Sequence, residues 1–175
     1  IGIVSEDPIA RTMDVADPVG LLMGIVPSTN PTSTAIFKSI IAIKARNGIV
    51  FSPHPSAAKC TLKAATLMRD AAVEAGAPEN IIGCISMPSM PATDELMHSK
   101  EVKMIIATGG PGMVKASYSA GKPALGVGAG NSPAYIERTA NVQQAVTNII
   151  ASKTFDYGTI CASEQSIICE ECNKD

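Results

Sequence analysis

The sequence predicts an α/β fold in which a parallel sheet is covered by helices on both faces. Two observations lead to this prediction. Short, almost entirely apolar runs alternate with longer segments in which apolar residues recur at helical spacing. Strands that are apolar on both faces are typical of parallel sheets buried between helices. The 175 residues, 46% apolar and 17% charged, are those of a globular protein with a substantial core.

The first half of the chain contains two predicted helices and three predicted strands. Pro31, a residue favoured in the first turn of a helix, opens the first helix, and Asn47-Gly48 ends it. Gly76 and Pro78 end the second helix, which is rich in Ala and Leu. The predicted strands are 19–27, 49–51 and 81–86, and the predicted helices are 31–46 and 56–75.

The same alternation continues in the second half, with strands predicted at 103–107 and 123–127 and helices at 112–120 and 142–152. In an open parallel sheet, ligands bind beyond the carboxyl ends of the strands. The segments 52–55 and 108–110 would lie at that edge.

Composition and charge narrow the class of protein. A formal net charge of -2 and a pI of about 5.7 give no reason to expect nucleic acid or an anionic membrane surface as a partner. No run approaches the roughly 20 apolar residues that span a bilayer. Five cysteines, an odd number without a secretory signal, indicate a reducing compartment, so we expect a cytoplasmic protein. The missing initial Met suggests a chain cut at its front.

Cys161 is the best candidate for a nucleophile. It follows a turn signal at Gly158 and precedes small polar residues, whereas Cys60 and Cys84 lie in helical and strand-like runs and are expected in the core. The alternative is a small buried thiol, as most free cysteines are. Cys169 and Cys172 form a C-x-x-C pair that could indicate metal or redox chemistry, but four zinc ligands are not visible, so we expect no metal.

A thiolate that attacks a carbonyl creates an oxyanion, and the Asn30 amide could stabilise it. The residues alone favour an ordinary helix-start or turn residue at Asn30. Thr108, Gly109 and Gly110 follow a strand and precede a helix, so their N–H groups could meet a pyrophosphate or simply form a turn. The loop 126–131 (GVGAGN) lacks the last glycine of G-x-G-x-x-G.

Taken together, Asn30-Pro31, ATGGPGMVK at 107–115, GVGAGN at 126–131 and TICASEQ at 159–165 resemble an acylating, CoA-dependent aldehyde dehydrogenase. The order and spacing of the motifs match. The most similar groups are the microcompartment enzymes of ethanolamine and propanediol use and the aldehyde half of bifunctional aldehyde-alcohol dehydrogenases. Because that family continues beyond the cysteine and this chain stops fourteen residues after it, we expect a piece of a larger enzyme.

The resemblance implies a Rossmann-like NAD- and CoA-binding domain at 1–152 and the start of a truncated catalytic domain at 153–175. It implies that Cys161 is the nucleophile and that Asn30 and the Cys161 N–H form the oxyanion hole. The implied cofactor-binding residues are Ser52, His54, Thr108, Gly109, Gly110, Val127 and Gly128.

Two departures from hydrolytic relatives favour acyl transfer to CoA. Val127 stands where those enzymes have a glutamate base for water, and a thiol needs such help less than water does. Ser52 stands where they have a lysine that holds the adenosine ribose, which favours NAD and a looser site. A hydrolytic NAD(P) enzyme and a non-catalytic nucleotide-binding fragment are the alternatives. The resemblance also implies a small aldehyde substrate, a homo-oligomer and a location in the cytoplasm or a bacterial microcompartment.

Overall fold

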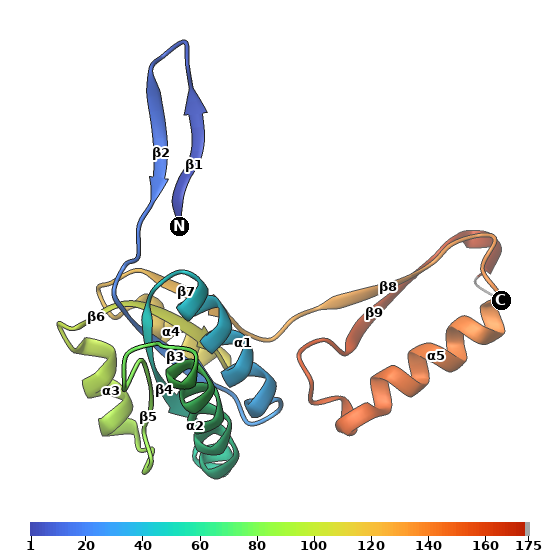
Figure 1. Cartoon of the computed structure of the whole chain (residues 1–175). Helices are drawn as coiled ribbons and strands as arrows, with labels where there is room; N and C mark the ends of the chain where they lie inside the picture. Colours follow the sequence, from blue (N-terminus) through green and yellow to red (C-terminus); the bar gives the residue numbers. More distant parts are fainter. Residues whose placement is uncertain (174–175) are drawn as a thin grey trace. The chain divides into compact units, whose positions relative to one another are not determined.

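The computed structural model describes residues 1–173, which fall into two compact units. The first unit is Ile1–Val127, and the second begins at Gly128 (Figure 1). The predicted boundary between a cofactor domain and a catalytic domain after residue 152 stays a prediction. Among residues 1–173, no helix combines the length and the apolar character needed to cross a membrane.

The first unit confirms the predicted α/β fold with a parallel sheet. Five parallel strands lie in the order β5-β4-β3-β6-β7. The strands are β3 Leu21–Val26, β4 Gly48–Pro53, β5 Ile82–Cys84, β6 Val102–Thr108 and β7 Ala124–Val127. The helices are α1 Pro31–Lys44, α2 Ala58–Glu74, α3 Met90–His98 and α4 Pro111–Tyr118, and the 3-10 turn η1 Pro55–Ala57 precedes α2. A separate antiparallel hairpin, β1 Gly2–Asp7 and β2 Thr12–Ala16, was not predicted.

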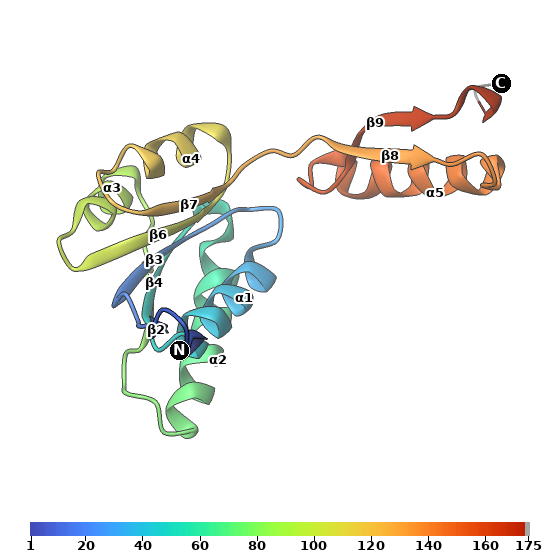
Figure 2. The same ribbon diagram turned by 90° about the horizontal axis from the view of Figure 1, so that it is seen from above.

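Helices cover both faces of this sheet, as predicted (Figure 2). Because side chains alternate along a strand, β3 contributes to two separate cores. Leu22 and Val26 pack with residues of α1 and α2 on one face. Met23 and Ile25 pack with residues of α3 and β6 on the other face. The central strand is therefore buried on both sides, which explains its uninterrupted apolar sequence.

Lys38 joins the two central strands at their carboxyl ends. It lies on the buried side of α1 with 1% of its surface exposed. Its Nζ donates hydrogen bonds to the carbonyl oxygens of Ile25 at 2.6 Å and Ile106 at 2.8 Å. Burial lowers the pKa of the Lys38 ammonium from 10.5 to about 7, because removal from water disfavours the charged form.

The second unit is a strand-helix-strand arrangement. The strands β8 Ser132–Ile136 and β9 Glu164–Cys169 are parallel, and α5 Val142–Thr154 lies between them in sequence. Two short 3-10 segments follow α5 and β9, namely η2 Phe155–Gly158 and η3 Glu171–Asn173. Helix 142–152 was predicted, whereas β8 and β9 were not.

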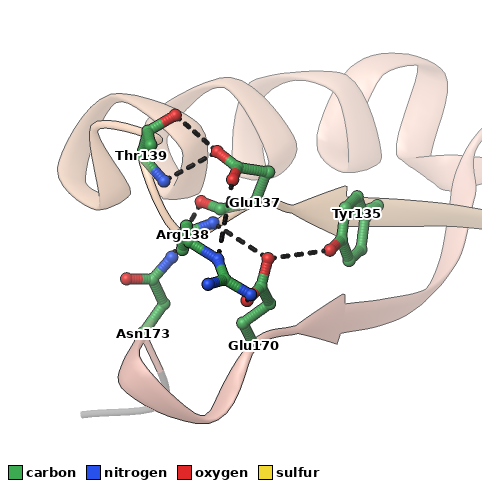
Figure 3. A network of polar contacts seen from close by, with 6 residues as sticks. All are labelled: Tyr135, Glu137, Arg138, Thr139, Glu170 and Asn173. Atoms are coloured by element: carbon green, nitrogen blue, oxygen red, sulfur yellow. Dashed lines mark hydrogen bonds and ion pairs between the residues drawn. The ribbon is translucent and has the colours of Figure 1, made fainter.

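A polar network ties the carboxyl ends of β8 and β9 together (Figure 3). Arg138 Nη2 lies 2.6 Å from Glu170 Oε2, and Tyr135 Oη donates to Glu170 Oε1 at 3.0 Å. Asn173 Nδ2 donates to the carbonyl oxygen of Glu137 at 2.8 Å. The hydrogen bond from Arg138 lowers the pKa of the Glu170 carboxyl, and the hydrogen bond to Glu170 raises the pKa of Tyr135. Together these contacts hold the two strand ends in register.

The pKa of Lys38 predicts a pH dependence of stability. Between pH 7 and pH 10.5 the unfolded chain binds a proton at Lys38 that the folded chain does not, so the free energy of unfolding rises with pH in this window. From pH 7 to pH 9 this group should add about 2 to 3 kcal/mol. Lys38→Met should remove the rise and, by leaving two buried carbonyls unpaired, lower stability by about 1 to 3 kcal/mol for each.

Urea unfolding of wild type and Lys38→Met at pH 7 and pH 9 measures this effect. Lys44→Met, a change to an exposed lysine of the same helix, is the matched control and should keep the wild-type response. A wild-type protein that does not gain stability over Lys38→Met between the two pH values would contradict the assignment.

Candidate active site

The loops at the carboxyl edge of the first unit's sheet carry most of the predicted cofactor-binding residues. His54 N donates to Val26 O at 3.0 Å, which joins the ends of β4 and β3. Gly109 N donates to Val127 O at 3.1 Å, which joins the ends of β6 and β7. The chain changes direction across the sheet between β3 and β6, and ligands bind at such switch points in open parallel sheets.

Asn30 lies directly before α1, but its side chain makes no helix-capping hydrogen bond. Its backbone carbonyl instead accepts from Thr34 N at 3.1 Å and Thr34 Oγ1 at 2.7 Å. Its Oδ1 accepts from Thr29 Oγ1 at 3.2 Å, and within residues 1–173 its Nδ2 has no hydrogen-bond partner. The side chain is exposed. Asn30 therefore has the position of an ordinary helix-start residue but keeps its amide donor available for a ligand.

Ser52 and His54 differ sharply in exposure. Ser52 is 3% exposed, and its hydroxyl lies 2.8 Å from that of Thr93 on α3, so both hydroxyls are committed inside the fold. His54 is exposed, and its Nδ1 accepts from Ser56 N at 3.3 Å. Nδ1 also lies 2.7 Å from the Ser56 hydroxyl, whereas Nε2 has no hydrogen-bond partner within the described part of the chain.

The segment Thr108 to Gly110 leads into α4 with open space around it. Gly110 O accepts from Met113 N at 3.0 Å, which begins the helix. A Cβ atom on Gly110 or Gly112 would meet no atom within 4 Å. Pro111 has no N–H, so the N–H of Gly112 is the first donor of this helix end. Such a helix end attracts anions.

Gly126, at the start of the GVGAGN loop, allows α4 to pack closely against β7. A Cβ atom there would lie 2.6 Å from Val114 Cγ1 and 2.8 Å from Tyr118 Cε2. Its N–H donates to Tyr118 Oη at 2.9 Å, which satisfies a donor on the free edge of β7. The next residue, Val127, is 57% exposed and ends the strand.

In the second unit, Cys161 is exposed on a turn closed by a hydrogen bond from Ser163 N to Ile160 O at 3.0 Å. Three residues with left-handed backbones precede this turn: Asp156 (φ 48°), Tyr157 (φ 54°) and Gly158 (φ 68°). The predicted turn at Gly158 is therefore present. A side chain at Gly158 would also place its Cβ 3.0 Å from the carbonyl oxygen of Lys153.

The loop that begins at Gly128 runs against the backbone of Cys161. A Cβ atom on Gly130 would lie 2.9 Å from the Cys161 carbonyl oxygen, closer than side chains pack. Only glycine fits between the loop and the cysteine, so this residue fixes how closely the two segments approach.

The other four cysteines differ in exposure. The expectation of a core position for Cys60 is wrong, because it lies on the solvent face of α2 and is exposed. Cys84 is partly buried, and burial raises the pKa of its thiol to about 11. Cys169 and Cys172 are exposed, and residues 1–173 contain no cluster of three or more His, Cys, Asp or Glu that could hold a metal.

The predicted site residues thus form two groups, each within its own unit. One group lies at the carboxyl ends of strands or in the loops after them at one edge of the first unit's sheet: Asn30, Ser52, His54, Thr108, Gly109, Gly110 and Val127. Gly128 and Cys161 belong to the second unit. The sequence reasoning missed Lys38 beneath the first group and the contact of Ser152 with Glu164 beside Cys161. The buried face of α1 also carries Thr34 and Ser39, so no uniformly apolar face marked Lys38 in the sequence.

Comparison with known proteins gives consistent matches. Residues 3–175 match the model of the aldehyde dehydrogenase family. The chain is 56% identical over 167 residues to the bifunctional aldehyde-alcohol dehydrogenase AdhE of Escherichia coli K12, covering 95% of this chain and 19% of that protein. It therefore spans about a fifth of this relative's length.

Solved structures agree with the sequence matches. An acetylating aldehyde dehydrogenase from Geobacillus thermoglucosidasius is 61% identical with a TM-score of 0.89, over 98% of this chain and 38% of that one. A propionaldehyde dehydrogenase from Rhodopseudomonas palustris, with bound CoA and an acylated cysteine, is 39% identical with a TM-score of 0.81, over 89% and 35% of the two chains. The chain belongs to the aldehyde dehydrogenase family.

Proposed function

We propose that the protein containing this chain oxidises a short aldehyde to an acyl-CoA with NAD, through a thioester on Cys161. The observation that carries the proposal is the exposed Cys161 turn, held against a glycine loop that contains no carboxylate. The similar enzyme from Rhodopseudomonas palustris carries an acyl group on a cysteine and binds CoA, which supports the same chemistry here.

In the first step, the sulfur of Cys161 attacks the carbonyl carbon, a C–S bond forms and the carbonyl oxygen becomes an oxyanion. The Cys161 N–H has no hydrogen-bond partner within the described residues, so it is available as one donor to this oxygen. The free Nδ2 of Asn30 is proposed as the other donor. Such donors act where charge develops in the transition state.

NAD, when bound, accepts the hydride that converts the Cys161 adduct into a thioester. The first turn of α4 fits a pyrophosphate, because the Gly112 N–H and the open space at Gly110 leave room for phosphate oxygens. The unpartnered Nε2 of His54 is available to bind a phosphate at the same edge of the sheet. We propose that Ser52 acts indirectly, since its hydroxyl is bonded to Thr93 and no lysine stands there to favour a 2′-phosphate.

In the second half-reaction, the thiolate of CoA attacks the thioester carbon, a new C–S bond forms to CoA, the bond to Cys161 breaks and Cys161 leaves as a thiolate. A thiol is far more acidic than water, so the absence of a base at Val127 suits this acceptor better than hydrolysis. We place the enzyme in the cytoplasm or in a bacterial microcompartment, as a homo-oligomer.

Turnover by the intact protein should need both CoA and Cys161. With a short aldehyde and NAD, we expect sustained NADH formation only when CoA is present, and Cys161→Ser should abolish it because the nucleophile is lost. Cys60→Ser, a change to another exposed cysteine, should keep activity. Formation of free acid without CoA would instead identify a hydrolytic enzyme.

Removal of the Asn30 amide should slow chemistry rather than weaken cofactor binding. Asn30→Ala should lower kcat by about 10²- to 10³-fold, the usual effect of losing one oxyanion donor, with the KM for NAD unchanged. Asn148→Ala, on the exposed face of α5, is the control. A loss confined to the KM for NAD would assign Asn30 to cofactor binding instead.

A side chain at residue 130 should displace the nucleophile. Gly130→Ala would place a Cβ 2.9 Å from Cys161 O, so the turn must shift and kcat should fall by about 10²-fold. Gly48→Ala, whose Cβ would make only ordinary contacts from 3.5 Å, should stay active. Wild-type kcat in Gly130→Ala would show that this close approach does not position Cys161.

A further inference from the structure

The segment that carries Cys161 is closed at its base by one side-chain contact. Ser152, in the last turn of α5, donates from Oγ to Oε1 of Glu164, the first residue of β9, at 2.9 Å. The contact joins the two ends of the segment 153–163, which contains the left-handed turn and the nucleophile. We call this contact the Ser152–Glu164 clasp.

Glu164 depends unusually strongly on this contact. Its other oxygen, Oε2, is buried and has no hydrogen-bond partner within residues 1–173. The Ser152 hydroxyl is therefore the one hydrogen-bond donor that the Glu164 carboxylate has in the described part of the chain. Glu164 is half-buried and Ser152 is exposed, so a carboxylate that lost this donor would gain by turning its unpartnered Oε2 towards water.

Only Ala162 and Ser163 separate Glu164 from Cys161, so a movement of Glu164 would also move the nucleophile. Glu164 pairs with Ser132 at the start of the parallel pair β8 and β9, and the register shifts immediately afterwards. Two residues before Ser132, Gly130 lies against the Cys161 carbonyl oxygen. Glu164 at the start of β9 and Gly130 just before β8 thus border the nucleophile turn on two sides. The polar network around Glu170 holds the opposite ends of the same strands.

We propose that Ser152 and Glu164 are positioning residues for Cys161: the clasp keeps the sulfur in the attacking position without contacting the substrate. This inference rests on the proposed aldehyde chemistry. The variants follow from the contact itself, since Ser152→Ala removes the donor and Ser152→Thr restores a hydroxyl. Arg138→Met is the matched control, because it breaks the ion pair at the far end of β8 and β9 and leaves the clasp intact.

The experiment measures NADH formation with a short aldehyde, NAD and CoA, and in parallel the hydrogen–deuterium exchange of residues 153–163 in the intact protein. Ser152→Ala should lower kcat by about 10²-fold, the size expected for a misplaced reactive group, with the KM for NAD unchanged. The hydrogen-bonded amides of Thr159 and Ser163 should exchange faster. Ser152→Thr should recover most of kcat, and Arg138→Met should keep it.

Three results would contradict the positioning role of the clasp. They are unchanged hydrogen exchange in Ser152→Ala, faster exchange with wild-type kcat in Ser152→Ala, or a loss of kcat in Arg138→Met equal to that in Ser152→Ala. If wild type turns over no aldehyde, the proposed function fails, and alkylation of Cys161 by iodoacetamide then tests the clasp alone. An altered alkylation rate at Cys161 in Ser152→Ala, with Cys60 in the same sample unchanged, would support it. Equal rates at both cysteines would reject it.

Discussion

The two hydrogen bonds from Lys38 Nζ hold β3 and β6 together at their carboxyl ends, which form the centre of the edge where ligands bind in such sheets. β3 and β6 are neighbours, although α1, β4, η1, α2, β5 and α3 lie between them in sequence. Asn30 follows the carboxyl end of β3, and Thr108 is the last residue of β6. One amino group bonded to Ile25 O and Ile106 O fixes the spacing of both strand ends, and its burial lowers its pKa because the charged form is kept from water.

In the second unit, polar contacts rather than a buried core hold the ends of the strands. Two strands and one helix bury little apolar surface, and Ile167, Ile168 and Tyr135 remain largely exposed. Polar contacts therefore define its geometry at both strand ends: Arg138 with Glu170 at one end, and Ser152 with Glu164 at the other. A close approach that only Gly130 permits completes the second of these ends.

Burial explains much of what could be predicted from the sequence, but α3, which buries Met97, was not predicted, and α5, which has no buried residue, was. β3 and α1 lie in the cores and were predicted to within a few residues. The hairpin β1–β2 and strand β9 have largely exposed side chains, so no hydrophobic periodicity marks them. Residue patterns also identified Cys161 and its turn. They could not show that Ser52 faces Thr93, since that partner lies 41 residues away in sequence.

The backbone before Cys161 shows why the nucleophile needs support from both sides. Left-handed conformations at Asp156 and Tyr157 cost of order 1–3 kcal/mol each, and a free segment would relax out of them. Thr159 opposes this relaxation by donating from N and Oγ1 to Asp156 O at 3.1 and 2.8 Å. These contacts lie within the segment and cannot fix it relative to the strands. Only contacts that reach outside it, from Glu164 and Gly130, can hold the strained turn and its thiol in one place.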